Sequence, residues 1–263
     1  MLNKLLKYDL KYMVKNMAVF YILAIFFAIL TRILFEVSNS VIMNIISQIS
    51  LGFMYAMVAN IIINTVIRSW IRFKDSIYKD EAYLTHTLPV TKDAIYNSKF
   101  IQTLIFFIVG FIIVLLSLFI TYYTPERWLL LKGFVSKITT GLEFNTTVFI
   151  TSFIAIIFLE IFNAIQCGFL GIILGHRKNN YKIGYSVLFG FIAYLVSQSI
   201  VLFLTFICGL FNSNIMDLFK SNVMFDNTSF KLLVILAIVL YLFIIWIMSI
   251  INKRVLNKGV NID

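Results

Sequence analysis

The sequence predicts an all-α membrane protein with six transmembrane helices. Of its 263 residues, 61% are hydrophobic and only 13% are charged, whereas soluble domains carry about 25% charged residues. The apolar residues gather in runs long enough to cross a bilayer, and the mean hydropathy is +0.95. Lys and Arg fall mainly in alternate intervals between these runs. Such a chain cannot cover itself with a solvated surface.

Residues 1–17 precede the first apolar run and have helical periodicity. Lys4, Lys7, Lys11 and Lys15 repeat every three or four residues on one face, while apolar residues follow the other. The pattern predicts an interfacial amphipathic helix with its apolar face in the acyl boundary. The alternative is a cytoplasmic extension of the first span. The apolar run that follows is longer than the apolar region of a signal peptide and has no small-residue cleavage site behind it, so a cleavable signal peptide is not expected.

We expect the six spans to form one transmembrane domain over residues 18–251, followed by a tail at 252–263. The expected spans are about 18–35, 41–67, 100–123, 145–175, 183–210 and 230–251. Of the 22 basic residues, 16 lie in the N-terminal strip, the interval between spans two and three, the loop after span four, and the tail. This bias predicts that both termini are cytoplasmic, which agrees with an even number of spans.

The longest polar interval, residues 68–99, connects the second and third spans. A short helix is expected over 75–86. Pro89 then disfavours helix at the residue before it, and Thr91 is suited to cap a helix that continues into the third span. Asp93 is favourable in the first turn of that helix. The interval therefore predicts helix, break and helix, attached rigidly to a span. The alternative is a solvated connection without a partner.

Polar residues inside the spans are further candidates for function. Glu160 lies near the middle of the fourth span, where insertion scales assign an acid a cost of about 2.5–3.5 kcal/mol, so it should face protein or water. Gln198 should lie at similar depth and is its expected partner. One interpretation is a polar translocation path formed by Glu160, Asn163, Gln166, Gln198, Asn60 and Asn64. The other is hydrogen bonding between packed helices. The spacing does not separate the two.

Small residues in the apolar runs are expected to serve packing. Gly168, Gly171 and Gly175 lie along the second half of the fourth span and include a GxxxG pair. They predict close helix packing, with a gating hinge as the alternative. Cys167 and Cys208 both fall inside apolar runs, at different expected depths, so no disulfide is predicted.

No catalytic or metal-binding motif is recognisable. Phosphate-binding loops, zinc-protease motifs, serine-hydrolase elbows and clustered His/Cys ligands do not occur. The two histidines, His86 and His176, lie in different loops and are expected to be solvated. We therefore expect no metal site and no cofactor in this chain, and any ATP must bind another chain. The net charge of +10 suits an anionic leaflet, and nucleic acid is not an expected partner.

The segment DEAYLTHTLPVTKDAIYNSKF, residues 80–100, resembles part of a known transporter class. It is similar to the corresponding segment of bacterial permeases of the type-2 class of ABC transporters, the ABCG-like exporters. Members often have an acidic pair, a tyrosine, THTLP, a basic residue and Ser-Lys entering the third span. The matching residues are Asp80, Glu81, Tyr83, Leu84, Thr85, His86, Thr87, Leu88, Pro89, Lys92, Ser98 and Lys99. The N-terminal strip, the six spans and the short basic loop after span four also resemble that class.

The resemblance implies that membrane transport and ATP hydrolysis are carried out by separate subunits. Two six-span chains would pair, as a homodimer or with a homologous permease, and two copies of a separate ATPase subunit would bind ATP and Mg. The interval between spans two and three would hold a cytoplasmic coupling helix. The implied ATPase contact is Asp80, Glu81, Tyr83, Leu84 and His86, with a secondary contact at His176, Arg177 and Lys178. Because relatives move lipids, drugs or amphipathic peptides, we expect export of an amphipathic substrate across the bacterial cytoplasmic membrane.

A second hypothesis is a stand-alone membrane protein. It would be an immunity or sensor protein, or an ion-coupled carrier that uses Glu160. A carrier is expected to show inverted repeats with interrupted spans, and no clear repeat occurs in the sequence. A membrane enzyme is a third hypothesis, which the lack of convergent polar residues weakens.

Overall fold

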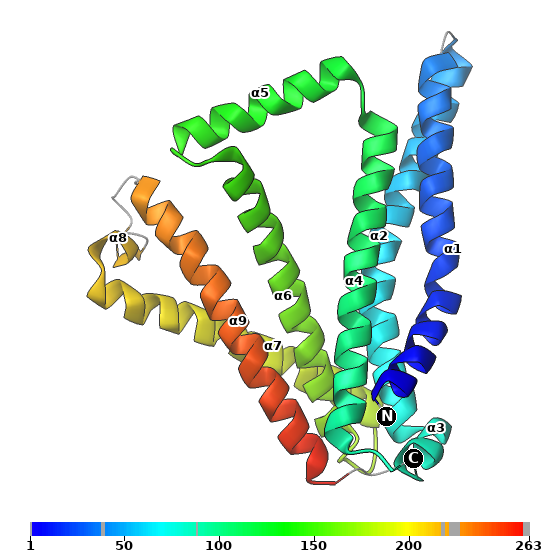
Figure 1. Cartoon of the computed structure of the whole chain (residues 1–263), viewed down its shortest axis with the longest axis vertical. Coiled ribbons are helices and arrows are strands. Elements are labelled where there is room, and N and C mark those ends of the chain that lie inside the picture. The colour runs from blue at the N-terminus through cyan, green and yellow to red at the C-terminus, as the bar shows by residue number, and fades with distance from the viewer. Residues whose placement is uncertain (1, 38–39, 88, 217–218, 221–226, 260–263) are drawn as a thin grey trace. The chain divides into compact units, whose positions relative to one another are not determined.

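Six long helices dominate the structure. The computed structural model describes, with no β-strand, residues 2–37, 40–87, 89–216, 219–220 and 227–259. Six of the helices are long and apolar enough to cross a membrane, which confirms the predicted all-α class and the number of spans. The chain divides into an N-terminal unit, residues 1–129, and a C-terminal unit, residues 130–263. Each unit contains three of the long helices (Figure 1).

The N-terminal unit is built around a helix that packs lengthwise on two others. Its helices are α1 (Leu2–Val37), α2 (Val41–Tyr78), α3 (Asp80–Thr87) and α4 (Lys92–Tyr122). α1 packs against both α2 and α4. Met13 and Met17 of α1 are buried against Phe106 of α4, and farther along Ala24 of α1 packs with Ile61 of α2. The apolar core of this unit therefore follows α1.

α1 joins the N-terminal strip to the first span in one continuous helix. Its 36 residues correspond to about 54 Å, well beyond the ~30 Å hydrocarbon thickness of a bilayer. Part of the face expected in the acyl boundary is buried in protein instead, because Met13 and Met17 pack on α4 while Val14 stays 55% exposed. The strip is thus an extension of the first span, and its placement in the interface stays a prediction.

α2 runs to Tyr78, beyond the expected end of the second span at residue 67. No proline interrupts it, and one face of the extension is buried at spacings of three and four, at Ser69, Arg72, Phe73, Ser76 and Ile77. The helix ends at Lys79, whose backbone is extended. The helix expected over 75–86 is therefore divided between the end of α2 and α3.

The start of α4 agrees with the sequence prediction. The Thr91 side-chain oxygen accepts a hydrogen bond from the backbone nitrogen of Ala94 at 3.2 Å, so Thr91 is the N-cap. Asp93 lies in the first turn, where its negative charge interacts favourably with the positive end of the helix dipole. The predicted cap is confirmed, and it fixes the point at which the chain turns from α3 into the third span.

The C-terminal unit is organised around α6. The remaining helices are α5 (Pro125–Gly141), which contains the boundary between the units, α6 (Thr146–Gly175), α7 (Lys182–Phe211), α8 (Ser213–Met216) and α9 (Asn227–Asn257). α6 packs against both α7 and α9. Because α9 continues to Asn257, the first part of the expected cytoplasmic tail is helical.

α6 and α7 cross at very short range where both helices carry small residues. A Cβ atom added to Gly171 would lie 2.5 Å from the backbone nitrogen of Gly190, and one added to Gly175 would lie 2.5 Å from the backbone nitrogen of Ser186. Ordinary side chains do not tolerate such distances. The structure therefore confirms the close packing predicted from the GxxxG pair.

The crossing predicts a position-specific effect of one added methyl group. Gly171→Ala should destabilise the protein by about 1–3 kcal/mol, because the new Cβ meets rigid backbone. Gly184→Ala, in the first turns of α7, is the matched control, since nothing lies within 4 Å of its added Cβ. Thermal unfolding in detergent, followed by the exposure of the buried Cys167 thiol, measures both. Equal unfolding midpoints for the two variants would contradict the assigned crossing.

Candidate functional site

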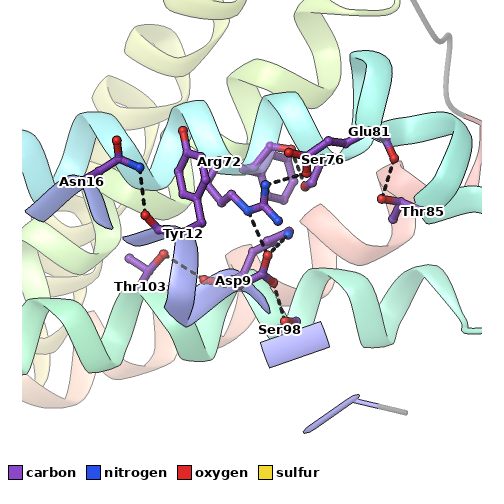
Figure 2. A network of polar contacts seen from close by, with 11 residues as sticks. Asp9, Tyr12, Asn16, Arg72, Ser76, Glu81, Thr85, Ser98 and Thr103 are labelled. Carbon is purple, nitrogen blue, oxygen red and sulfur yellow. Dashed lines mark hydrogen bonds and ion pairs between the residues drawn. The ribbon is translucent and has the colours of Figure 1, made fainter. Parts of the chain in front are cut away.

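Polar and charged side chains from α2 and α4 surround Asp9 of α1 in the N-terminal unit (Figure 2). Asp9 is only 1% exposed. Its Oδ1 accepts hydrogen bonds from Arg72 Nε at 2.9 Å and from Lys99 Nζ at 2.5 Å. Its Oδ2 accepts one from Ser98 Oγ at 2.6 Å. One carboxylate therefore holds α1, α2 and α4 together at the ends that adjoin α3.

Arg72 extends this contact to α3. Its Nη1 donates to Glu81 Oε2 at 2.5 Å, while its Nε is bonded to Asp9. The guanidinium carbon also lies 4.7 Å from the centroid of the Tyr12 ring, whose face attracts cations. The Arg72 side chain is 10% exposed and the Glu81 side chain 51% exposed. A single guanidinium thus bridges a buried acid and an acid at the surface.

We call Asp9, Arg72, Ser98, Lys99 and Glu81 the Asp9 cluster. Its buried part contains two cations, Arg72 and Lys99, and one anion. Removing an ion from water costs several kcal/mol unless paired charges and hydrogen bonds compensate. Glu81 supplies the second negative charge and is the member that reaches solvent. The charge balance of the buried cluster therefore depends on the position of α3.

Among the contact residues expected on α3, the structure describes the side chains of Glu81 and Tyr83. Tyr83 is 60% exposed, and the neighbouring Ala82 is fully buried, so α3 has an inner and an outer face. Glu81 is half exposed and is bound to Arg72 as well. The side chains of Asp80, Leu84 and His86 lie outside the described part of the structure.

The expectation of a solvated histidine at position 176 is wrong. His176 is 1% exposed, and its Nδ1 lies 2.9 Å from the Ile172 carbonyl oxygen and 3.5 Å from Ser186 Oγ. The short distance between α6 and α7 encloses the ring at the end of α6. Arg177 and Lys178 are exposed, and Arg177 donates to the carbonyl oxygen of Val255 on α9 at 2.5 Å.

A second polar cluster lies on α6, α7 and α9 in the C-terminal unit. The Tyr194 hydroxyl donates to Glu160 Oε1 at 3.1 Å, and the Tyr241 hydroxyl donates to Gln198 Oε1 at 3.1 Å. The partner of Glu160 is therefore a tyrosine, whereas Gln198, the expected partner, is bonded to α9. We call Glu160, Tyr194, Gln198 and Tyr241 the Glu160 cluster.

Two other members of the expected polar path connect packed helices. Asn163 Nδ2 donates to Ser197 Oγ at 3.0 Å, and Asn252 Nδ2 donates to Gln166 Oε1 at 3.0 Å. Asn163, Gln166 and Asn252 are fully buried. These contacts fit the interpretation of hydrogen bonding between helices, because each amide joins α6 to a neighbour.

Asn60 and Asn64 lie in the N-terminal unit and bond to their own helix. Asn60 Nδ2 donates to the Ala56 carbonyl oxygen at 2.9 Å, and Asn64 Nδ2 donates to the Asn60 carbonyl oxygen at 3.0 Å. The six residues of the expected path are therefore divided between the units, and neither unit assembles the whole path.

The centre of the first cluster, Asp9, was missed by the sequence analysis, although a signal for it exists. Asp9 lies four residues from Leu5 and Met13 and eight from Met17, so it falls within the apolar face of the N-terminal strip. An acid in the apolar face of a helix predicts a buried partner of opposite charge. Tyr194 and Tyr241 lie in apolar runs and carry no comparable signal.

Neutralising Asp9 should destabilise the protein strongly. Asp9→Asn leaves two buried cations facing one remaining acid, and such losses cost about 3–5 kcal/mol. Asp93→Asn is the matched control, because Asp93 is an exposed first-turn acid whose loss costs less than about 1 kcal/mol. Unfolding in mixed detergent micelles gives both values. If the losses in unfolding free energy from Asp9→Asn and Lys99→Gln were strictly additive in the double variant, the two side chains would not be coupled, which would contradict the assigned pair.

Comparison of the chain with protein-family models, with curated proteins and with solved structures found no match. Among the described residues, no group of three or more His, Cys, Asp or Glu side chains is arranged to hold a metal ion. The two polar clusters are therefore the structural basis on which a function is assigned.

Proposed function

We propose that this chain is the membrane subunit of an ATP-driven ABC exporter and that α3 is its coupling helix. The observation that carries the proposal is the ionic connection from Glu81 on α3, through Arg72, to Asp9 and Lys99. A helix that receives a push from an ATPase needs a stiff connection to the spans. The Asp9 cluster offers one, because it joins α3 to α1, α2 and α4.

The connection is stiffer than a surface salt bridge would be. Exposed ion pairs contribute about 0–1 kcal/mol, so they separate easily. Separating Glu81 from Arg72 instead disturbs the charge balance of a buried carboxylate and a buried lysine, which is costly. Displacement of α3 is therefore transmitted to the ends of three long helices. In the exporter, that displacement follows closure of the ATPase dimer.

The outer face of α3 presents an exposed aromatic side chain of the kind found in protein contacts. Tyr83 is 60% exposed, and the Glu81 side chain is 51% exposed. Interface centres are enriched in aromatic residues. The proposed ATPase contact comprises this face together with Asp80, Leu84 and His86, and the exposed Arg177 and Lys178 form the proposed secondary contact. His176 is not part of that contact surface, because its ring is buried.

The remaining features of the proposal follow from the sequence pattern and the resemblance. Two copies of the chain, or one copy and a homologous permease, form the pore, and two ATPase subunits bind ATP and Mg. The complex lies in the bacterial cytoplasmic membrane with both termini inside. Its cargo is an amphipathic molecule, such as a peptide, that leaves the cell.

The Glu160 cluster supports the alternative of a stand-alone carrier. Glu160 carries an ionisable group in the middle of a span and is hydrogen-bonded to a single tyrosine hydroxyl in the described structure. Transport by the isolated chain, driven by a proton or sodium gradient without nucleotide, would favour this alternative.

A photo-crosslinking amino acid at position 83 should capture the ATPase subunit. Tyr83 is exposed on α3, whereas Phe134, 67% exposed on α5 and outside the expected cytoplasmic segments, is the control position. In native membranes, the position-83 crosslink should contain a nucleotide-hydrolysing protein and should exceed the position-134 crosslink by about an order of magnitude, since the crosslinker reacts only with groups in van der Waals contact. The same partner captured equally from both positions would contradict α3 as the primary contact.

Charge reversal at Asp80 should release the ATPase without unfolding the chain, because Asp80 is not a member of the Asp9 cluster. Co-purification of the tagged protein from its native membrane should yield a stoichiometric ATPase, and Asp80→Lys should abolish its recovery. Glu143→Lys is the control, because Glu143 is a 72%-exposed acid outside the cytoplasmic segments. A tagged chain that carries no nucleotide-hydrolysing partner would overturn the exporter proposal.

A further inference from the structure

Glu160 is an acid that no basic residue of this chain can neutralise in the middle of the membrane. The sequence has no Lys or Arg between Lys137 and Arg177 on either side of Glu160. The neighbouring helices α7 and α9 have none between Lys182 and Lys220 or between Lys231 and Lys253. A second copy has the same cation-free spans. A positive charge at this depth must therefore come from outside the chain.

The structure gives Glu160 a neutral partner only. None of the ion pairs in the described residues includes Glu160, and its hydrogen bond comes from the Tyr194 hydroxyl at 3.1 Å. Tyrosine rings such as that of Tyr194 attract organic cations through their faces. A carboxyl beside a tyrosine is a combination that suits an ammonium or a quaternary cation.

The surface beside Glu160 suits the apolar part of such a ligand. Phe153 and Ile157 precede Glu160 by seven and three residues, so the three side chains share one face of α6. Phe153 is 60% exposed and Ile157 is 44% exposed. Glu160 and Tyr194 are themselves only half-buried. One face of α6 thus offers an apolar stripe that ends at an accessible acid.

We propose that Glu160 and Tyr194 bind the positive charge of a lipophilic cation, with its apolar part along Ile157 and Phe153. This names the substrate class of the exporter as amphipathic cations, and it rests on the proposed function only in treating the bound molecule as cargo. Binding itself requires the chain alone. A small inorganic ion would not need the apolar stripe, so a hydrophobic organic cation is the ligand that fits.

The test measures binding of tetraphenylphosphonium to the purified chain in lipid nanodiscs by equilibrium dialysis. This probe is a lipophilic cation without a titratable proton, and triphenylphosphine oxide is the neutral analogue. Glu160→Gln should raise the Kd for the cation about tenfold or more, because a charge–charge attraction is lost in a region of low dielectric constant. Glu160→Asp should retain most of the binding.

Matched variants distinguish binding of the probe at this site from its partition into the lipid. Glu143→Gln removes an exposed acid elsewhere in the C-terminal unit and should leave the Kd unchanged. Equal binding of the cation by the wild type and by Glu160→Gln overturns the proposal. It is also overturned if Glu160→Gln weakens binding of the neutral analogue as much as binding of the cation. Because no ATPase is present, a negative result here leaves the crosslinking result at Tyr83 intact. If the chain binds the cation but captures no ATPase, the binding site is supported and the exporter proposal is contradicted.

Discussion

The N-terminal unit depends on keeping one buried carboxylate paired. Asp9 has less exposed surface than either of its cationic partners, and α1, α2 and α4 each supply a group to its hydrogen bonds. A buried charge tolerates little displacement, because each ångström of separation weakens an attraction that no water replaces. Other polar contacts between these helices include neutral pairs, such as Thr31 and Ser50, whose hydroxyl oxygens lie 2.8 Å apart. The carboxylate therefore fixes how far the three helices can shift along one another at this end.

Buried ion pairs join helices in the N-terminal unit, whereas the contacts described between helices of the C-terminal unit are mainly neutral. In the C-terminal unit, neutral side chains such as Asn163 and Gln166 bond across helices, and glycines let backbones approach. Neutral hydrogen bonds between membrane helices contribute about 0.6 kcal/mol each on average. They exchange partners more readily than ions do. The helices of the C-terminal unit can therefore shift against one another more easily than α1, α2 and α4 can at the Asp9 cluster.

Much of the fold could be predicted from the sequence, because the features concerned are local. Apolar run length indicates six spans, Thr91 indicates a cap, and Gly171 with Gly175 indicates a close crossing. The sequence predicts a shorter α2 than the structure has, because hydropathy alone does not distinguish the polar residues of a helix packed on protein from those of a loop. The partners of Asp9 and Glu160 lie on other helices. Their pairing depends on helix rotation, which no single-sequence pattern specifies.

The separation of the Asp9 partners along the chain imposes an order on biogenesis. Asp9 and Arg72 are 63 residues apart and Asp9 and Lys99 are 90 apart. During synthesis the first two helices can therefore join through Asp9 and Arg72 before the third exists. Lys99 completes the group only when α4 enters the bilayer. Until then Asp9 and Arg72 neutralise each other as a pair, so neither of these two charges is left isolated while α4 is being made.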